Sequence, residues 1–106
     1  MRQLFHLSLV LVGNYCAIYL EILIFDRKKN PIEGSYTNKL FQKGKNKIAQ
    51  KVGEEAVELI IEAKDQNKEL FLNEGADLIY HLLVLLAEKN YRFEEIIDIL
   101  RKRHSK

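Results

Sequence analysis

Apolar residues recur with the spacing of amphipathic helices in four stretches of the chain, which short polar connectors separate. These stretches predict helices over residues 19–30, 38–63, 70–89 and 93–103. The first helix should end before Pro31, because the residue that precedes a proline is pushed out of the helical region. The second should begin after a cap at Ser35 or Thr37 and loosen at Gly44. Four helices with short connections indicate an all-α bundle.

The first 25 residues differ from the remainder of the chain because 18 of them are apolar. Residues 4–20 carry no charged side chain, yet this run is short for a transmembrane helix, which needs about 20 apolar residues. Three interpretations stay open: an irregular extension, a membrane-related segment such as a signal peptide, and an added core element. We expect residues 1–18 to form an extension and residues 19–106 to form the functional domain.

The composition of the 106 residues excludes several classes of protein. A net charge of +2 argues against a dedicated nucleic-acid binder. The single cysteine, Cys16, rules out an internal disulfide framework and fits a reducing compartment, so we expect a cytoplasmic protein. Five glycines and one proline supply too few turns for an all-β fold. The length allows a modest core, which oligomerisation would enlarge.

The small net charge hides a strong segregation of charge along the chain. Residues 26–53 carry eight basic and two acidic residues, a net of +6, whereas residues 54–77 carry eight acidic and two basic residues, a net of −6. Salt bridges across a helical hairpin would explain this segregation, although each such pair contributes little at a surface. The alternative is a site that binds a polyanion together with a metal ion.

Carboxylates lie beside the apolar face of the helix expected to end at Ala63. That face consists of residues within about 60° of one another on a helical wheel: Ile48, Val52, Leu59 and Ala63. Three glutamates lie at its edge or just beside it: Glu55, Glu58 and Glu62. The next helix repeats this arrangement, with Glu74 on its leucine-rich face and with Asp77 and His81 on the adjoining flank.

Carboxylates placed beside a buried surface need a cation, because burial of an unpaired negative charge is strongly unfavourable. Mg²⁺ prefers oxygen ligands and commonly bridges to substrate phosphates. The spacing is E-x-x-E at Glu55 and Glu58, followed by E-x-x-D at Glu74 and Asp77. A single E-x-x-E is common on solvated helices, but two such pairs on consecutive antiparallel helices favour a metal site. We therefore expect these four residues to bind Mg²⁺.

Lysines at every fourth position precede and enter the acidic helix: Lys39, Lys43, Lys47 and Lys51. They align on one face if the helix is continuous. A solvated helix face is the ordinary explanation, but beside a Mg²⁺ site they resemble phosphate ligands. His81 lies one turn from Asp77 and is either a hydrogen-bonded structural residue or a member of the site.

The stretches "GSYTNKLFQKGKNKIAQKVGEEAVELIIEA" and "NEGADLIYHLLVLLAEKN" closely resemble the phosphoribosyl-ATP pyrophosphohydrolases of histidine biosynthesis. The resemblance runs from about Leu20 to His104, and residues 1–18 match no usual part of the family. The wider group of MazG-like all-α NTP pyrophosphatases shares only the metal pattern. The resemblance implies a four-helix-bundle-like homodimer that depends on Mg²⁺ and cleaves phosphoribosyl-ATP to phosphoribosyl-AMP and pyrophosphate.

The resemblance also implies roles for individual residues. The metal ligands match Glu55, Glu58, Glu74 and Asp77. Glu54 stands beside them, and either Glu54 or Glu58 is expected to act as the general base, so the expected catalytic residues are Glu54, Glu55 and Glu58. The signature loop and the basic positions, together with the nearby histidine, give the residues expected to contact the substrate: Ser35, Tyr36, Thr37, Lys39, Lys47, Lys51 and His81.

Two other functions stay open. A house-cleaning (d)NTP pyrophosphatase would share the metal site, although the signature loop argues against it. A non-enzymatic helical dimerisation module tethered by residues 1–20 would bind no Mg²⁺. The sequence thus predicts a Mg²⁺-dependent, homodimeric pyrophosphohydrolase with a small-molecule substrate and with neither a nucleic acid nor a membrane as partner.

Overall fold

The structure is a computed structural model that describes the backbone of residues 2–105 and the side chains of residues 16–105. Over this range the backbone forms helices and no strand, which confirms the all-α fold class. The helices are α1 (Arg2–Lys29), α2 (Tyr36–Lys43), α3 (Lys45–Ala63), α4 (Lys68–Glu88) and α5 (Phe93–Arg103). The bounds of α5 are as expected, and those of α4 differ from the expectation by one or two residues.

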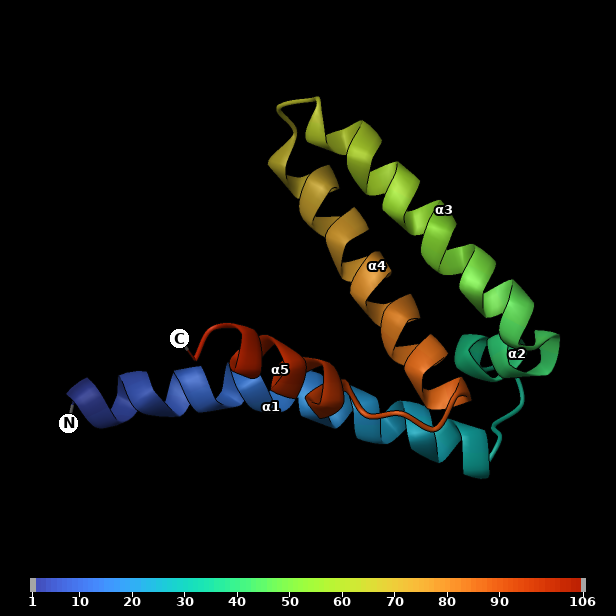
Figure 1. Cartoon of the computed structure of the whole chain (residues 1–106), viewed down its shortest axis with the longest axis horizontal. Coiled ribbons are helices and arrows are strands. Elements are labelled where there is room, and N and C mark those ends of the chain that lie inside the picture. Colours follow the sequence, from blue (N-terminus) through green and yellow to red (C-terminus); the bar gives the residue numbers. More distant parts are fainter. Residues whose placement is uncertain (1, 106) are drawn as a thin grey trace.

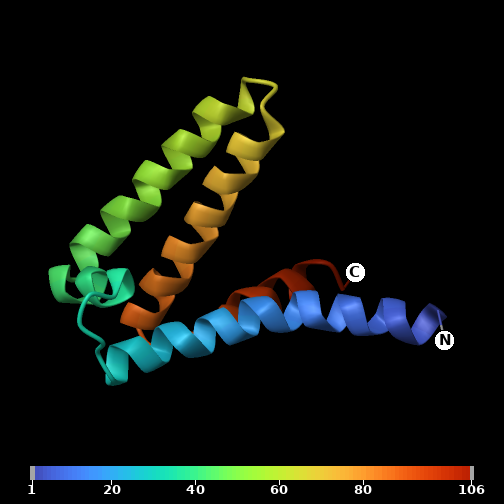
Figure 2. The same cartoon turned by 180° about the vertical axis from the view of Figure 1, so that it is seen from behind.

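The helices α3 and α4 form an antiparallel hairpin, and the long α1 crosses beneath its open end (Figure 1). The short α2 lies at the foot of the hairpin, where it contacts α1, α3 and α4. Seen from behind, the turn that joins α3 to α4 is the part of the hairpin farthest from α1 (Figure 2). The structure therefore has a packed foot and a free-standing arm.

The helix α1 begins at Arg2 rather than near Tyr19. The irregular conformation expected for the extension is therefore wrong over residues 2–18, which continue the helix. No proline precedes Pro31, so nothing in the sequence stops the helix from extending through this apolar run. Met1 and the side chains of residues 2–15 lie outside the described part of the structure, and the role of residues 1–18 stays a prediction.

Local signals set the start of α2 and its separation from α3. The Ser35 hydroxyl accepts a hydrogen bond from the backbone N–H of Asn38 at 3.3 Å, which confirms one of the two expected caps. Gly44 then adopts a φ of 93°, a conformation that side chains with a Cβ rarely tolerate, and the chain turns there. The break is complete, so the continuous helix that would align the four lysines on one face is not formed. Lys39 and Lys43 belong to α2, and Lys47 and Lys51 belong to α3.

The apolar core lies at the foot of the hairpin. It consists of buried residues from α1 to α4: Ile24, Leu40, Ile48, Leu83, Val84 and Ala87. Among the described residues, α4 is the helix that is long and apolar enough to cross a membrane by length and composition. Three of the core residues belong to α4, and 22% of the most apolar window of this helix is buried within the structure.

Two charged side chains of α1 hold the ends of other helices. Lys28 Nζ donates to the carbonyl oxygens of Ala87 and Glu88 at 2.9 and 3.1 Å, and so satisfies the C-terminal end of α4. Glu21, which is 4% exposed, accepts from the backbone N–H of Phe93 at 2.6 Å, at the first residue of α5. The same carboxylate accepts from Arg92 Nε at 2.9 Å. The foot thus depends on buried polar contacts as well as apolar packing.

We expect Glu21→Ala to lower the free energy of unfolding by about 1–3 kcal/mol, because the substitution leaves a backbone N–H at the start of α5 without its partner. Urea denaturation measures the loss. Arg101→Ala is the control, because Arg101 pairs only with exposed carboxylates and should change stability by less than about 1 kcal/mol. Equal effects of the two substitutions would contradict the proposed importance of the buried contact.

Candidate metal centre

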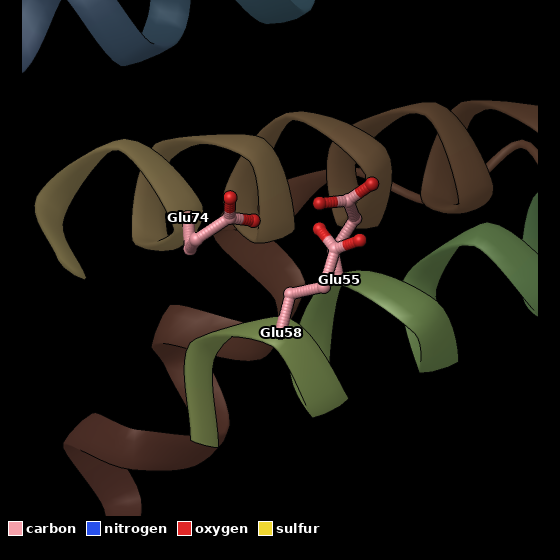
Figure 3. Close-up of side chains that lie close together, drawn as sticks. All are labelled: Glu55, Glu58 and Glu74. Atoms are coloured by element: carbon pink, nitrogen blue, oxygen red, sulfur yellow. The ribbon is translucent and has the colours of Figure 1, made fainter. Parts of the chain in front are cut away.

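Three glutamates converge where α3 faces α4. Glu55 and Glu58 extend from α3 and Glu74 extends from α4 (Figure 3). One carboxylate oxygen of each residue lies within 4.8 Å of those of the other two. We call these three residues the glutamate cluster. Its geometry follows from the i, i+3 spacing on α3 and from the antiparallel packing of the two helices.

The carboxylate oxygens of the glutamate cluster are poorly compensated by the protein. Glu55 is 7% exposed, and its Oε2 atom is buried without a hydrogen-bond partner. Glu74 Oε2 is in the same situation. Within the described side chains, the one ion pair to the cluster is that of Lys51 Nζ with Glu55 Oε1, at 3.5 Å. Negative charge therefore exceeds positive charge at this point.

The excess negative charge raises the pKa of Glu74 to about 7. The largest cause is Glu58, whose carboxylate accepts a hydrogen bond when Glu74 is protonated; burial comes next, and the charges of Glu58 and Glu55 add to it. A proton can thus substitute for a cation in holding the cluster together. A hard divalent cation is the better partner, because it can take an oxygen from each of three carboxylates, two of which have unpartnered buried oxygens. The donor set therefore fits such an ion.

Two of the expected acidic residues lie outside the glutamate cluster. Asp77 is exposed on α4, and its side chain does not belong to the group of converging oxygens. Glu54 is also exposed, and it accepts a hydrogen bond from Gln50 Nε2 at 2.8 Å. That hydrogen bond is the largest cause of the lowered pKa of Glu54, and Lys51 adds to it. Neither residue is placed where the structure brings the carboxylates together.

Glu62 is a candidate that the expected ligand set omits. It lies one turn beyond Glu58 on α3, and its Oε2 atom is buried without a hydrogen-bond partner. The sequence carried a signal for it, because Glu58 and Glu62 have the i, i+4 spacing that places both beside the same apolar face. The structure leaves Glu62 outside the glutamate cluster but close to it along the helix.

The lysines differ in their relation to the glutamate cluster. Lys51 Nζ lies 3.3 Å from Glu54 Oε2 and 3.5 Å from Glu55 Oε1. Burial lowers the pKa of the Lys51 ammonium, but Glu54, Tyr36 and Glu55 raise it by more, so the group stays charged. Lys47 lies one turn earlier on α3, whereas Lys39 is exposed on α2. Only Lys51, of the lysines expected to bind phosphate, makes an ion pair with the acidic residues of α3 in the described structure.

The expected loop residues are held against α4 by hydrogen bonds. Tyr36 Oη lies 3.0 Å from His81 Nε2, and the hydroxyl of Thr37 bonds to that of Tyr80. His81 is 5% exposed, so it is buried rather than open to a ligand. Tyr36 remains half exposed and is the loop residue with a free face toward solvent. The structure thus brings Lys51 into contact with the glutamate cluster and holds Tyr36 against the buried His81.

Comparison with known proteins gives matches over most of the chain. A family model described as phosphoribosyl-ATP pyrophosphohydrolase matches residues 18–104. The chain is 60% identical over 84 residues to the phosphoribosyl-ATP pyrophosphatase of Clostridium acetobutylicum, covering 79% of this chain and 76% of the relative. It is 58% identical over 80 residues to the phosphoribosyl-ATP pyrophosphatase of Listeria welshimeri, covering 76% and 77% of the two chains. The resemblance drawn from the sequence is confirmed.

A longer protein also matches. The chain is 54% identical over 86 residues to the histidine biosynthesis bifunctional protein HisIE of Bacteroides thetaiotaomicron. The match covers 81% of this chain but 42% of that protein, so the chain spans less than half the length of this relative.

We expect the stability of the metal-free protein to fall as the pH rises through the range set by Glu74. The folded pKa of about 7 exceeds the ordinary value of 4.5, so the folded state holds a proton that the unfolded chain releases. This stabilisation is complete below about pH 4.5 and is lost as the pH rises through about 7. Urea denaturation in EDTA should show the decline in the wild type and not in Glu74→Gln.

Glu69→Gln is the matched control for this measurement, because Glu69 is an exposed glutamate on the same helix. It should keep the decline seen in the wild type. If Glu74→Gln and Glu69→Gln show the same pH dependence as the wild type, the raised pKa of Glu74 is refuted.

Proposed function

We propose, because the chain belongs to the phosphoribosyl-ATP pyrophosphohydrolase family, that it cleaves the α–β phosphoanhydride of phosphoribosyl-ATP. The products are phosphoribosyl-AMP and pyrophosphate, and the reaction is the second step of histidine biosynthesis. The protein is a hydrolase, and the names of its relatives assign this step to them. We propose that it acts in the cytoplasm, because its single cysteine fits a reducing compartment.

The single observation that carries the proposal is the glutamate cluster. Hydrolysis of a triphosphate requires positive charge beside phosphate oxygens, and this site holds carboxylates whose buried oxygens have no protein partner. We propose Mg²⁺ as the cation, held by Glu55, Glu58 and Glu74, with Glu62 one turn beyond Glu58 on α3 and Asp77 outside the group of converging oxygens. When bound, Mg²⁺ supplies charge that offsets the phosphate oxygens and makes a water molecule more acidic.

The residues of the chain supply the remaining functions. Glu58 is exposed and, among the described side chains, has no ion-pair partner, so a carboxylate oxygen of Glu58 that does not hold Mg²⁺ can accept the proton of the attacking water. Glu54 is the poorer general base, because its hydrogen bond with Gln50 and its contact with Lys51 lower its pKa. Lys51 stays charged and can stabilise the negative charge that develops on the phosphate at the cleaved bond.

The loop and the other lysines are proposed to bind the substrate. Lys47 precedes Lys51 by one turn of α3, and Lys39 lies on α2, so both can reach phosphates that extend from the cluster toward the foot of the hairpin. Ser35 and Thr37 act by shaping the loop, because their hydroxyls are engaged with Asn38 and Tyr80. Tyr36 keeps a free face for the substrate.

The arm of the hairpin supports a homodimer. Leu83 and Ala87 of α4 are buried in the core with Ile24 of α1. The same face of α4 continues toward its N-terminus through residues at i, i+3 and i+4 spacing that remain exposed: Ile79, Ala76 and Leu72. Three residues of α3 are also exposed, Val57, Ile60 and Ile61. An apolar face of this extent is covered when a second copy packs its own hairpin against the first.

We expect Glu58→Gln to reduce pyrophosphate release from phosphoribosyl-ATP by at least about 100-fold, because the substitution removes both a metal ligand and the proposed base. The helical circular dichroism should be unchanged, because Glu58 is exposed and contributes no packing. Glu69→Gln is the control and should retain wild-type turnover. Turnover of Glu58→Gln at the wild-type rate would refute the assignment.

The same assay separates the alternative functions. Wild-type enzyme should release pyrophosphate from phosphoribosyl-ATP only with Mg²⁺, and much more slowly from a panel of dNTPs. Faster hydrolysis of the dNTPs would instead identify a house-cleaning pyrophosphatase. No hydrolysis and no Mg²⁺-dependent shift in thermal stability would identify a non-enzymatic helical module.

We expect Ile79→Lys to weaken the dimer by at least about tenfold in dissociation constant, because it places a charge at the centre of the exposed face of α4. Light scattering after size-exclusion chromatography measures the oligomeric state. Ile32→Lys is the control, because Ile32 is 49% exposed, close to the 53% of Ile79, but lies in the loop before α2. A monomeric wild type would contradict the proposed dimer.

A further inference from the structure

Tyr36 and His81 form a pair that the proposed mechanism does not use. Tyr36 is the first residue of α2 and is 49% exposed, whereas His81 lies on α4 and is 5% exposed. The hydroxyl oxygen of Tyr36 is 3.0 Å from His81 Nε2. The two rings meet edge to face, and Tyr80 packs against the same histidine with a centroid distance of 5.1 Å. The imidazole is therefore fixed by packing as well as by hydrogen bonds.

The second nitrogen of His81 decides the direction of the bond to Tyr36. His81 Nδ1 lies 2.7 Å from the backbone carbonyl oxygen of Asp77. A carbonyl oxygen can only accept, so Nδ1 carries the hydrogen. The neutral imidazole has a single N–H, which leaves Nε2 with a lone pair. To a neutral His81, the Tyr36 hydroxyl therefore donates the hydrogen bond.

This direction determines what Tyr36 can offer to a ligand. A hydroxyl has one hydrogen to donate and lone pairs to accept with, and the hydrogen of Tyr36 is already committed to His81. The remaining capacity of Tyr36 is that of an acceptor. Phosphate oxygens at neutral pH are acceptors as well, so Tyr36 cannot bond to them. A hydroxyl of a sugar can donate to it.

The position of Tyr36 indicates which part of the substrate it meets. Tyr36 contacts His81, which lies seven residues, or about two helical turns, from Glu74 along α4, and Lys51 contacts Glu55 of the glutamate cluster. Along the hairpin toward its foot, Tyr36 thus follows the glutamate cluster. In a nucleotide the ribose adjoins the α-phosphate, so a ribose hydroxyl falls beside the tyrosine when the phosphates occupy the cluster and the lysine.

We infer that His81 is a positioning residue that fixes the Tyr36 hydroxyl as an acceptor for a ribose hydroxyl of the substrate. The inference rests on the proposed function, because it takes the substrate to be a nucleotide whose phosphates lie at the glutamate cluster. His81 acts through Tyr36 and does not itself touch the substrate, which agrees with its burial.

The position of the hydrogen on the His81 imidazole can be tested by a measurement that requires no enzymatic turnover. Long-range ¹H–¹⁵N NMR of the ¹⁵N-labelled protein should show that His81 carries its hydrogen on Nδ1. The Tyr36→Phe variant should keep this tautomer, because the Asp77 carbonyl that fixes it is unchanged. A hydrogen on Nε2 in the wild type would overturn the inference, because Tyr36 would then be free to donate.

A double-mutant cycle tests whether His81 acts through the hydroxyl. Tyr36→Phe and His81→Phe should each raise the KM for phosphoribosyl-ATP by about 5- to 10-fold, with a smaller effect on kcat. The double variant should be no worse than Tyr36→Phe, because His81 has no role once the hydroxyl is gone. Additive effects would indicate a merely structural histidine and would overturn the inference.

Two further variants keep this cycle informative. His81→Gln places an amide oxygen near the position of the Nε2 atom of His81. It should restore part of the affinity lost in His81→Phe, and it still tests the positioning role if His81→Phe folds poorly. Tyr91→Phe is the matched control, because Tyr91 has the same exposed fraction as Tyr36, 49%, and lies in the connector after α4. It should leave KM unchanged, and no rescue by His81→Gln would count against the positioning role.

Substrate analogues identify the partner of Tyr36. Phosphoribosyl-ATP that lacks the 2′- or the 3′-hydroxyl of the adenosine ribose should bind the wild type about 5- to 10-fold less tightly in one of the two cases. The Tyr36→Phe variant should not distinguish that analogue from the full substrate. Equal discrimination by wild type and variant would overturn the ribose contact. A wild type that is inactive on phosphoribosyl-ATP would refute the proposed function, whereas the NMR result on the imidazole would be unaffected.

Discussion

Repulsion between carboxylates on the facing sides of α3 and α4 is the constraint on which this structure depends. Oxygens of Glu55, Glu58 and Glu74 lie within 4.8 Å of one another, and Lys51 compensates only one of these residues directly. Packing at the foot of the hairpin has to hold the two helices together against this repulsion. A proton on Glu74 or a bound cation reduces it, so the same arrangement that costs stability creates affinity for positive charge.

Helical periodicity predicted Glu55 and Glu74 of the glutamate cluster because both border an apolar face. Glu55 and Glu74 lie within about 40° of the apolar stripes of their helices, so the packing that buries those stripes also brings the carboxylates together. Asp77 lies about 100° from Leu78 on the same wheel, and it is exposed. A spacing motif alone does not distinguish Glu74 from Asp77, but the helical phase does.

Features that depend on contacts between residues far apart in the chain could not be predicted from the sequence. The bond between Tyr36 and His81 joins residues 45 apart, and it requires that α2 lie against α4. The break at Gly44 makes this placement possible, because it lets α2 leave the direction of α3. The start of α1 differs from the expectation for another reason: the apolar run before Tyr19 has a composition unlike that of the following residues, but it contains no proline that would stop the helix.

The separation of Lys28 from its acceptors at Ala87 and Glu88 has a consequence for how the chain folds. These contacts span 59 and 60 residues, whereas α3 and α4 are joined by a connector of four residues, 64–67. Closing a long loop costs more chain entropy than closing a short one. The contact of α3 with α4 in the hairpin therefore costs less chain entropy to form than the docking of α1. The glutamate cluster lies wholly within the hairpin, and its geometry therefore belongs to the local, rapidly formed part of the molecule.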